Sequence, residues 1–365
     1  MKISDFRKML KKNKFVFFTY KKLTDQVYRS GYKAYKKVKH LKSKEKFEKE
    51  ISLFKKYWNC DPMDYYRYRL FEKELSEEEL LDYIPNYYFY NYYMPKIYDG
   101  IDLSLTNSKV LMMNYLIGKK IETPLALAIV KKGLILDHLD HKLLFEDLVA
   151  KMLTSEARIF FVKPDDGQGG KGIFTIRKSN KNLYIDDRLL DENILRQKTI
   201  SNKFVLQEGI KQRSDINSIN PTSVNTLRVI TQTQDNVIKI SAVVIRIGRN
   251  ESVVDNSSQG GISVKIDIEK GTLNSFGSTE HTNEIFEEHP DTHFKFNGFV
   301  IQGWDKIMSQ VLEYANRISV FPELGWDIAV LENGISVIEI NAYYGLELLQ
   351  CCSGGMRRQL NVIPN

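Results

Sequence analysis

Cysteine is scarce in this sequence of 365 residues, and long apolar runs are absent. The three cysteines, Cys60, Cys351 and Cys352, are too few for a disulfide framework and include an adjacent pair, which indicates a cytoplasmic protein. No stretch reaches the roughly 18 apolar residues that a membrane-spanning helix needs, so we expect no transmembrane segment. The apolar run at residues 15–20 is too short for the core of a signal peptide.

The sequence also has few histidines, and it lacks the standard nucleotide-binding and nucleic-acid-binding motifs. His289 and His293 are four residues apart, but Pro290 follows the first of them and no cysteine lies nearby. These two and His281 offer too few ligands for zinc, so we expect no zinc site. The chain has no G-x-x-x-x-G-K-[ST] loop and no recognisable nucleic-acid-binding motif, so we expect no nucleic-acid partner.

Positive charge is concentrated near the N-terminus. The whole chain carries 53 Lys and Arg against 46 Asp and Glu, whereas residues 1–60 alone carry 19 basic and 5 acidic residues, a net charge of +14. The lysines follow a mostly helical spacing around an apolar run: Lys8, Lys11, Lys12, Lys14, Lys21, Lys22, Lys33, Lys36, Lys37, Lys39, Lys42, Lys44, Lys46 and Lys49. Peripheral attraction to an anionic membrane or a polyanionic glycan is one interpretation, and a solvated helical face is the other.

Tyrosine is enriched in residues 57–98, which hold eleven of the 20 tyrosines. Tyrosine rings can stack on sugars, so an acceptor-glycan surface is one interpretation. The other, which we favour, is that these rings pack a helical region onto the rest of the protein.

The central stretch at residues 158–178, RIFFVKPDDGQGGKGIFTIRK, predicts a strand, a glycine-rich loop and a second strand. Residues 159–162 are β-branched or aromatic, and Pro164 disfavours a helical conformation at Lys163. The loop holds Gly167, Gly169, Gly170 and Gly172. Because glycine has no Cβ, the backbone N–H groups can approach a ligand closely and form a phosphate clamp with a nearby lysine. An ordinary hairpin with a flexible tip is the alternative.

A second hairpin near the C-terminus carries acidic side chains. Asn333-Gly334 is a strong hairpin turn signal, and we expect Asp327 to start the strand before it. Glu339 and Asn341 are two residues apart on the next strand, so they project to the same face. Three oxygen ligands on one patch suit Mg²⁺, and a Glu within so apolar a hairpin is costly unless it is paired or bound to metal.

The phosphate loop and the D…E-x-N hairpin together resemble the ATP-grasp superfamily. Segments 220–231, 259–267 and 289–304 are similar to its sugar-transfer-associated branch, which is found beside glycosyltransferases in bacterial surface-polysaccharide loci. The resemblance covers the chain from about residue 107 onward. It implies an α+β fold, the ATP-grasp fold, with ATP and Mg²⁺ between two β-rich lobes. We call the glycine-rich loop between the two central strands the flap, and the hairpin that carries Asp327, Glu339 and Asn341 the acidic hairpin. The expected domains are a helical, basic and Tyr-rich region at 1–105, a linker lobe at 106–155, an N-lobe with the flap at 156–212, and a C-lobe with the acidic, metal-binding hairpin at 213–365.

The resemblance also implies roles for individual residues. Glu208 and Ile210 would present their backbone to the purine, and Asp215 would take the ribose hydroxyls. Asp327, Glu339 and Asn341 would hold the metal. Lys109 would contact a phosphate, although Ser108 precedes it where the family has Asp. The full nucleotide-binding set is Lys109, Lys163, Gly167, Gln168, Gly169, Gly170, Lys171, Gln207, Glu208, Gly209, Ile210 and Asp215.

Arg228 is the second catalytic candidate beside Lys163. It lies at the start of a predicted strand, where a guanidinium can stabilise charge that develops on a transferring phosphoryl group. Arg246 is an alternative for this role. The loop at residues 259–261 would bring its backbone close to a second substrate.

Further elements follow from local pattern. We expect helices at residues 108–119, 138–152, 189–197 and 304–318, and strands at 125–130, 204–207 and 236–247.

The implied activity is an ATP- and Mg²⁺-dependent carboxylate–amine ligase that forms ADP through an acyl phosphate. Its substrates would be a carboxylate-bearing sugar of a bacterial capsule or exopolysaccharide and an amino acid or other amine. Two alternatives stay open: a kinase that phosphorylates a sugar hydroxyl, and a non-catalytic scaffold for glycosyltransferases. The absence of an evident nucleophilic side chain agrees with phosphoryl transfer, which depends mainly on positioning and electrostatics.

Overall fold

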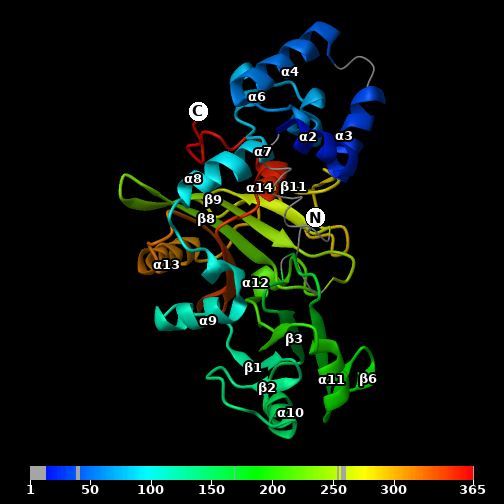
Figure 1. Ribbon diagram of the computed structural model, residues 1–365, viewed down its shortest axis with the longest axis vertical. Coiled ribbons are helices and arrows are strands. Elements are labelled where there is room, and N and C mark those ends of the chain that lie inside the picture. Colours follow the sequence, from blue (N-terminus) through cyan, green and yellow to red (C-terminus); the bar gives the residue numbers. More distant parts are fainter. Residues whose placement is uncertain (1–13, 38–41, 168, 253–254, 256–259, 365) are drawn as a thin grey trace.

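The computed structural model describes residues 14–37, 42–167, 169–252, 255 and 260–364. Within these residues the chain forms a helical N-terminal region and two antiparallel seven-stranded sheets, which confirms the expected α+β class. The N-terminal helices lie at one end, the second sheet in the middle and the first sheet at the other end (Figure 1). None of the helices in the described part is long and apolar enough to cross a membrane.

The first sheet has the strand order β2-β1-β7-β3-β4-β5-β6. Its strands are β1 (Ala126–Lys131), β2 (Leu134–Leu136), β3 (Ile159–Pro164), β4 (Phe174–Ser179), β5 (Asn182–Ile185), β6 (Arg188–Leu189) and β7 (Lys203–Glu208). Helices α10 (Phe145–Thr154) and α11 (Glu192–Thr199) contribute to its core. In β3, Phe160 and Val162 are fully buried in this core, whereas the alternate residues Phe161 and Lys163 line a cavity.

This sheet corrects the expected boundary between residues 155 and 156. Strand β1 belongs to the segment 106–155, yet it pairs with β7 from the segment 156–212. The reason is burial, because Ala128 and Val130 of β1 pack in the same apolar core as Val162 and Leu206. The two segments therefore build one lobe.

The second sheet has the strand order β12-β11-β10-β9-β8-β13-β14. Its strands are β8 (Thr226–Gln234), β9 (Val237–Ile247), β10 (Ile262–Ile266), β11 (Leu273–Thr279), β12 (Ile285–Phe286), β13 (Glu323–Leu331) and β14 (Gly334–Asn341). The long helix α13 (Trp304–Arg317) packs against β9 and β14, and α14 (Leu346–Ser353) packs against β10 and β11. The short helices α9 (Lys109–Gly118) and α12 (Ser214–Asn217) lie in the connections before and after the first sheet.

The N-terminal helical region shares one apolar core with the second sheet. Its elements are α2 (Lys14–Thr24), α3 (Gln26–Lys37), α4 (Lys44–Trp58), α5 (Met63–Arg67), η1 (Leu70–Glu72), α6 (Glu77–Leu81), α7 (Asn86–Tyr88), the π-helix η2 (Phe89–Tyr93), α8 (Met94–Ile97) and η3 (Ser104–Asn107). Tyr98 donates to the carbonyl oxygens of Glu323 (2.5 Å) and Ala342 (3.0 Å). Gln350 of α14 bonds both the N–H and the C=O of Ile84, at 2.8 and 2.9 Å. Most tyrosines of residues 57–98 are thus packing residues, in agreement with the interpretation favoured from the sequence.

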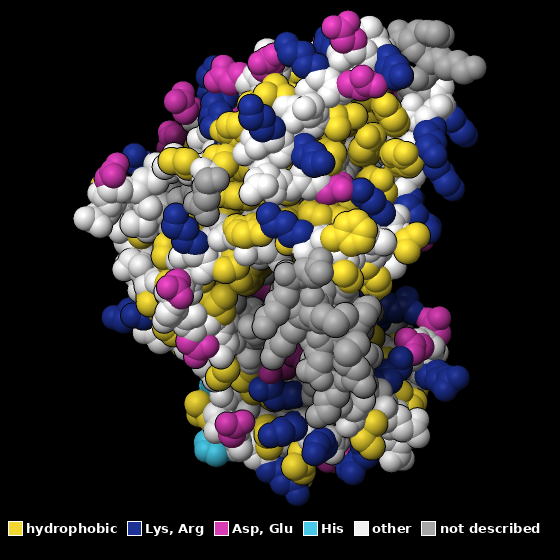
Figure 2. Space-filling view, turned by 45° about the horizontal axis from the view of Figure 1, so that its top comes forward, with side chains coloured by type: hydrophobic (Ala, Val, Ile, Leu, Met, Phe, Trp, Pro, Cys, Tyr) yellow, Lys and Arg dark blue, Asp and Glu magenta, His cyan; other side chains and the backbone are white. Residues whose placement is uncertain are grey.

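Several N-terminal lysines are paired within the helical region. Lys42 is buried and binds both oxygens of Glu50 at 2.9 Å, and Lys49 pairs with Glu77 at 2.8 Å. On this end of the molecule, basic side chains lie among apolar and acidic ones (Figure 2). Lys8, Lys11, Lys12 and Lys39 lie outside the described residues. Within the described residues, part of the positive charge of this region is therefore paired with acidic side chains.

Three predicted boundaries are wrong. The helix expected at 138–152 begins only at Phe145, because Asp137 accepts hydrogen bonds from the N–H groups of Leu139 and His141 and holds a turn. The helix expected at 189–197 begins at Glu192, where the Asp191 side chain caps it. Strand β13 begins at Glu323, so Asp327 lies in its middle.

Candidate active site

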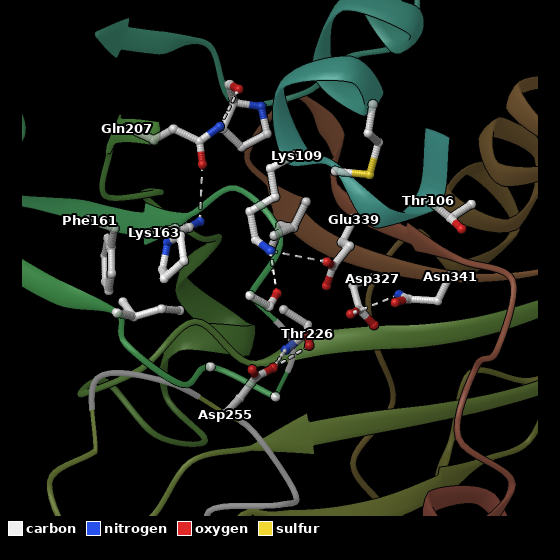
Figure 3. Close-up of a pocket in the computed structure, with 18 of the residues that line it drawn as sticks. Thr106, Lys109, Phe161, Lys163, Gln207, Thr226, Asp255, Asp327, Glu339 and Asn341 are labelled. Atoms are coloured by element: carbon white, nitrogen blue, oxygen red, sulfur yellow. Dashed lines mark hydrogen bonds and ion pairs between the residues drawn. The ribbon is translucent and has the colours of Figure 1, made fainter. Parts of the chain in front are cut away.

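A cavity of about 380 Å³ lies between the two sheets. The flap after β3, the start of α9 and the end of β7 line it from one side, and β8, β9, β13 and β14 line it from the other. Most of the residues predicted to bind nucleotide or metal converge here (Figure 3). Gly209 and Asp215 are the exceptions among the described ones, and Gln168 lies outside the described residues.

The flap contributes a lysine and glycine backbone. Lys163 donates to Gln207 Oε1 at 3.1 Å, and its Nζ lies 5.6 Å from the centre of the Phe161 ring. Burial lowers the pKa of Lys163 to about 8; Glu339 opposes the shift and Lys109 adds to it. Gly167, Gly169, Gly170 and Lys171 also line the cavity, and Gly169 and Gly170 have positive φ values of 62° and 70°. A side chain would strain these two positions, so the glycines keep the loop close to the cavity.

Lys109 reaches the flap from the first residue of α9. Its Nζ donates to the carbonyl oxygen of Gly167 at 2.6 Å and lies 3.6 Å from Glu339 Oε1. Lys109 therefore contacts both the glycine loop and the acidic hairpin.

Asp165 holds Lys109 in this place, and the sequence did not single it out. Its buried carboxylate accepts from Ser108 Oγ at 2.9 and 3.0 Å and from the Val110 N–H at 2.9 Å. Lys203 pairs with the same carboxylate at 2.8 Å. An acidic group is thus present at this helix start although Ser108 occupies the position before Lys109, because Asp165 supplies it from the flap.

The end of β7 forms an apolar slot with α9. Gln207, Glu208 and Ile210 line it together with side chains such as Phe161 and Met113. Gln207 Nε2 donates to the carbonyl oxygen of Pro124 at 2.8 Å, which fixes its amide beside Lys163. This part of the cavity therefore combines apolar side chains with the backbone at the end of a strand.

Gly209 and Asp215 lie off the cavity wall. The Gly209 N–H donates to the carbonyl oxygen of Ile159 at 2.8 Å, and a Cβ at Gly209 would also stand 2.8 Å from that oxygen. Both Asp215 oxygens bind Arg213, at 2.6 and 2.8 Å. Burial would raise the pKa of Asp215, but the Arg213 pair outweighs it and lowers the pKa.

The acidic hairpin has the register that its spacing suggested, with Asp327 opposite Glu339. Asp327 is buried, and Arg228 binds its Oδ1 through Nε at 2.5 Å and its Oδ2 through Nη2 at 3.0 Å. Arg246 Nη1 adds a contact to Oδ2 at 3.0 Å. Burial would raise the pKa of Asp327, but these two arginines lower it.

The side chains of β14 fit a divalent cation better than Asp327 does. Glu339 and Asn341 are partly exposed on one side of the strand and offer a carboxylate and an amide oxygen. Mg²⁺ takes such hard ligands together with phosphate oxygens and water. Asp327 would join them only where Arg228 or Arg246 releases one of its oxygens.

Asp255 is a further cavity residue without a signal in the sequence. Its Oδ2 accepts from the Thr226 N–H at 3.1 Å and from the Thr226 hydroxyl, and its Oδ1 lies 3.4 Å from Arg246 Nη2. Burial raises the pKa of Asp255, while Arg246 lowers it. Arg246 thus bridges two buried carboxylates, Asp255 and Asp327.

The histidines do not gather at this site. The buried ring of His289 contacts the carbonyl oxygen of Gly248 at 2.7 Å, and His293 pairs with Glu288 at the surface. Across the residues that the structure describes, no group of three or more His, Cys, Asp or Glu side chains is arranged to hold a metal ion.

The solved structures that match this chain include several synthetases. An N5-carboxyaminoimidazole ribonucleotide synthetase in complex with ADP is 13% identical, with a TM-score of 0.38 over 66% of this chain and 45% of that one. D-alanyl-alanine synthetase A from Vibrio cholerae is 10% identical, with a TM-score of 0.39 over 72% and 61% of the two chains. D-cycloserine synthetase is 10% identical, with a TM-score of 0.41 over 71% and 69%. This chain therefore spans about half to two thirds of the length of these proteins.

The comparison with protein families is more specific. A search of curated protein sequences found no match. The family model described as sugar-transfer associated ATP-grasp matches residues 88–364, which include the flap, both sheets and the acidic hairpin. The chain belongs to the sugar-transfer associated ATP-grasp family.

Proposed function

We propose that this protein is an ATP- and Mg²⁺-dependent ligase that joins a carboxylate to an amine and releases ADP and phosphate. The observation that carries the proposal is the arrangement across the cavity. Lys109 and Lys163 stand on the flap side, and the Glu339–Asn341 edge of β14 stands on the other, with Lys109 Nζ 3.6 Å from Glu339. Cations facing a pair of hard oxygen ligands suit a triphosphate with its metal.

The nucleotide would lie along the inner side of the first sheet. Its purine would occupy the slot at Gln207, Glu208 and Ile210, and its phosphates would lie under the glycine loop beside Lys163 and Lys109. Asp215 would bind the ribose only after leaving Arg213, so Glu208, which lines the cavity, is the nearer carboxylate for that role.

Glu339 and Asn341 would hold Mg²⁺, with Asp327 as a third ligand if one of its arginine contacts opens. When bound, Mg²⁺ would neutralise phosphate charge and orient the γ-phosphoryl group. The protein would hold these oxygen ligands on one hairpin, beside the lysines that would bind the same phosphates.

The reaction would proceed in two steps. A substrate carboxylate attacks the γ-phosphorus, the bond to the β-phosphate oxygen breaks, and an acyl phosphate and ADP result. The amine nitrogen then attacks the acyl carbon, and phosphate leaves with the electron pair of the broken C–O bond. Lys163 and Arg228 would stabilise the charge that moves among the phosphate oxygens, and no nucleophilic side chain is required.

The family description points to sugar transfer, so we propose a uronic-acid sugar of a bacterial capsule or exopolysaccharide as the carboxylate substrate and an amino acid or other amine as its partner. The test is to incubate purified protein with ATP, Mg²⁺ and pairs drawn from uronic acids and amines. We expect ADP and an amide. ADP with a phosphorylated sugar and no amide would identify a kinase instead, AMP would contradict the phosphoryl-transfer chemistry, and no nucleotide turnover with any pair would favour a scaffold.

We also propose that the protein works in the cytoplasm and touches anionic membrane or glycan through its N-terminal region. In α2, Phe15 and Leu23 are 80% and 69% exposed, close in sequence to Lys14, Lys21 and Lys22. Exposed apolar side chains near lysines on one helix suit an anionic interface. Co-sedimentation with phosphatidylglycerol vesicles, and its loss in Phe15→Ser together with Leu23→Ser, would test this; equal binding to neutral phosphatidylcholine vesicles would contradict it.

A further inference from the structure

Glu280 lines the same cavity but has no part in the nucleotide or metal site described above. It follows the last residue of β11 and is partly buried. No residue in the described part of the chain hydrogen-bonds to its carboxylate or forms an ion pair with it. A partly buried carboxylate without a partner is costly, so its position at a cavity wall suggests a ligand that supplies one.

Glu280 comes directly after β11, whose strand neighbours lead to Arg246. Arg246 pairs with Ser263 of β10, and Ser263 pairs with Ser278 of β11. Glu280 is two residues beyond Ser278, in the turn that follows β11. Glu280 and Arg246, which binds Asp327, both line the cavity.

The neighbouring acid, Glu347 on α14, is already satisfied. Its two oxygens accept from Asn86 Nδ2 at 2.9 Å and from the Tyr90 hydroxyl at 2.7 Å. Burial raises the pKa of Glu280 and Glu347 raises it further, whereas His281, Arg246 and Arg67 lower it. Of the two carboxylates, Glu280 is the one left open to a positively charged ligand.

The wall beside Glu280 is suited to an organic substrate. Tyr343 lines the cavity with its side chain 48% exposed, and Val224 and Leu348 add apolar surface. These residues belong to the second-sheet side of the cavity, whereas the flap and its lysines belong to the first-sheet side. A second substrate can therefore approach a phosphorylated carboxylate from the side that the nucleotide does not use.

We propose that Glu280 binds the ammonium group of the amine substrate and accepts its proton, which would make the α14 side of the cavity the amine subsite. This assignment rests on the proposed ligase function. One proton passes from R–NH₃⁺ to the Glu280 carboxylate, and the freed nitrogen lone pair forms the bond to the acyl carbon. The C–O bond to phosphate then breaks, phosphate leaves with that electron pair and takes up the second nitrogen proton, and the products are an amide and hydrogen phosphate.

The test compares an amine that must lose a proton with one that need not. Wild-type protein, Glu280→Gln and Glu287→Gln would receive ATP, Mg²⁺, a panel of uronic acids, and either hydroxylamine or one of L-alanine, L-lysine and ethanolamine. Hydroxylamine is mostly uncharged at neutral pH and traps acyl phosphates as hydroxamates. Glu287 is an exposed glutamate on the same segment and does not line the cavity, so it controls for the loss of one charge.

We expect the ratio of amide to hydroxamate formation to fall about 100-fold in Glu280→Gln and to stay at the wild-type value in Glu287→Gln. An unchanged ratio in Glu280→Gln, or a raised KM for ATP, would overturn the assignment and would leave the ligase function standing. The wild-type protein could make hydroxamate but no amide. In that case the amines should inhibit hydroxamate formation in the wild type and not in Glu280→Gln. Equal inhibition in the two proteins would overturn the assignment. Absence of ADP formation in the wild-type protein would instead contradict the ligase function itself.

Discussion

Arg228 of β8 donates hydrogen bonds to both carboxylate oxygens of Asp327 on the neighbouring strand β13, from Nε at 2.5 Å and from Nη2 at 3.0 Å. Arg246 contacts the same carboxylate and also Asp255, so two guanidiniums and two carboxylates form a buried, nearly neutral set. The set ties β13 to β8 and β9, because Arg228 and Arg246 come from those two strands. Glu339 of β14 lies directly opposite Asp327, so the set borders the edge that we propose holds the metal.

Removing the central carboxylate should be costly. Asp327→Asn leaves Arg228 buried with a weaker partner, and breaking one side of a buried ion pair typically costs about 3–5 kcal/mol. The measurement is the free energy of unfolding in urea, combined with Arg228→Met in a double-mutant cycle. A loss below about 1 kcal/mol in Asp327→Asn would show that the pair contributes little to the fold.

Glu339→Gln should separate activity from stability. Glu339 is partly exposed and its charge partner Lys109 lies at 3.6 Å, so we expect the free energy of unfolding to change by less than about 1 kcal/mol. Turnover should fall at least about 100-fold, because the carboxylate that we propose holds Mg²⁺ becomes a neutral amide. Asp99→Asn, at an exposed position away from the cavity, is the control. Activity within a few-fold of wild type in Glu339→Gln would remove the metal assignment.

Nucleotide affinity should depend on pH through Lys163. Its pKa of about 8 in the nucleotide-free protein lies below the value of about 10.4 for a free lysine. Phosphates bind the protonated amine, so ATP affinity should be full below pH 8 and should fall as the pH rises through 8. Between about pH 8 and about pH 10.4, Lys163 is more fully protonated in the unfolded chain than in the folded protein. The burial of Lys163 therefore lowers the free energy of unfolding at low pH, and this loss disappears as the pH rises from about 8 to about 10.4.

Calorimetric titration with ATP and Mg²⁺ from pH 7 to 9.5 would measure this dependence. Lys163→Met should bind ATP about 10- to 100-fold more weakly at pH 7 and should lose the dependence on pH near 8. A wild-type affinity that is flat over this range would contradict the burial of Lys163 at the phosphate site.

Asp165 should act on ATP binding indirectly. Asp165→Ala removes the acceptor for Ser108 Oγ and the Val110 N–H, so the start of α9 loses its anchor to the flap. We expect a loss of about 1–2 kcal/mol in the free energy of unfolding, as for other lost helix caps, together with weaker ATP binding because Lys109 is no longer held. Urea unfolding and ATP titration of the same protein measure both. Unchanged affinity with reduced stability would show that Lys109 does not depend on this anchor.

Local patterns in the sequence were sufficient to predict the flap and the acidic hairpin. Lys163 ends a short apolar strand before a glycine loop, and Asn333-Gly334 fixes the turn that brings Asp327 opposite Glu339. The pairing of strands that are far apart in the sequence could not be predicted from local patterns. Arg228 meets Asp327 only because β8 pairs with β13, ninety-nine residues away, and nothing local records that pairing.

The same limit explains the residues that the sequence analysis missed. Asp165 was visible in the flap, but its role depends on α9 approaching from more than fifty residues earlier. Asp255 and Glu280 lie in or beside loops of the second sheet, and only the sheet order brings them to the cavity. Asp215 was assigned to the ribose from the family resemblance, which could not show that Arg213 binds its carboxylate.

A crystal structure of the protein with Mg²⁺ and a non-hydrolysable ATP analogue tests the central claim most directly. We predict the purine at Gln207 and Ile210, the phosphates between Lys163 and Lys109, and the metal on Glu339 and Asn341. A nucleotide bound elsewhere, or one whose γ-phosphate points away from β14, would contradict the account.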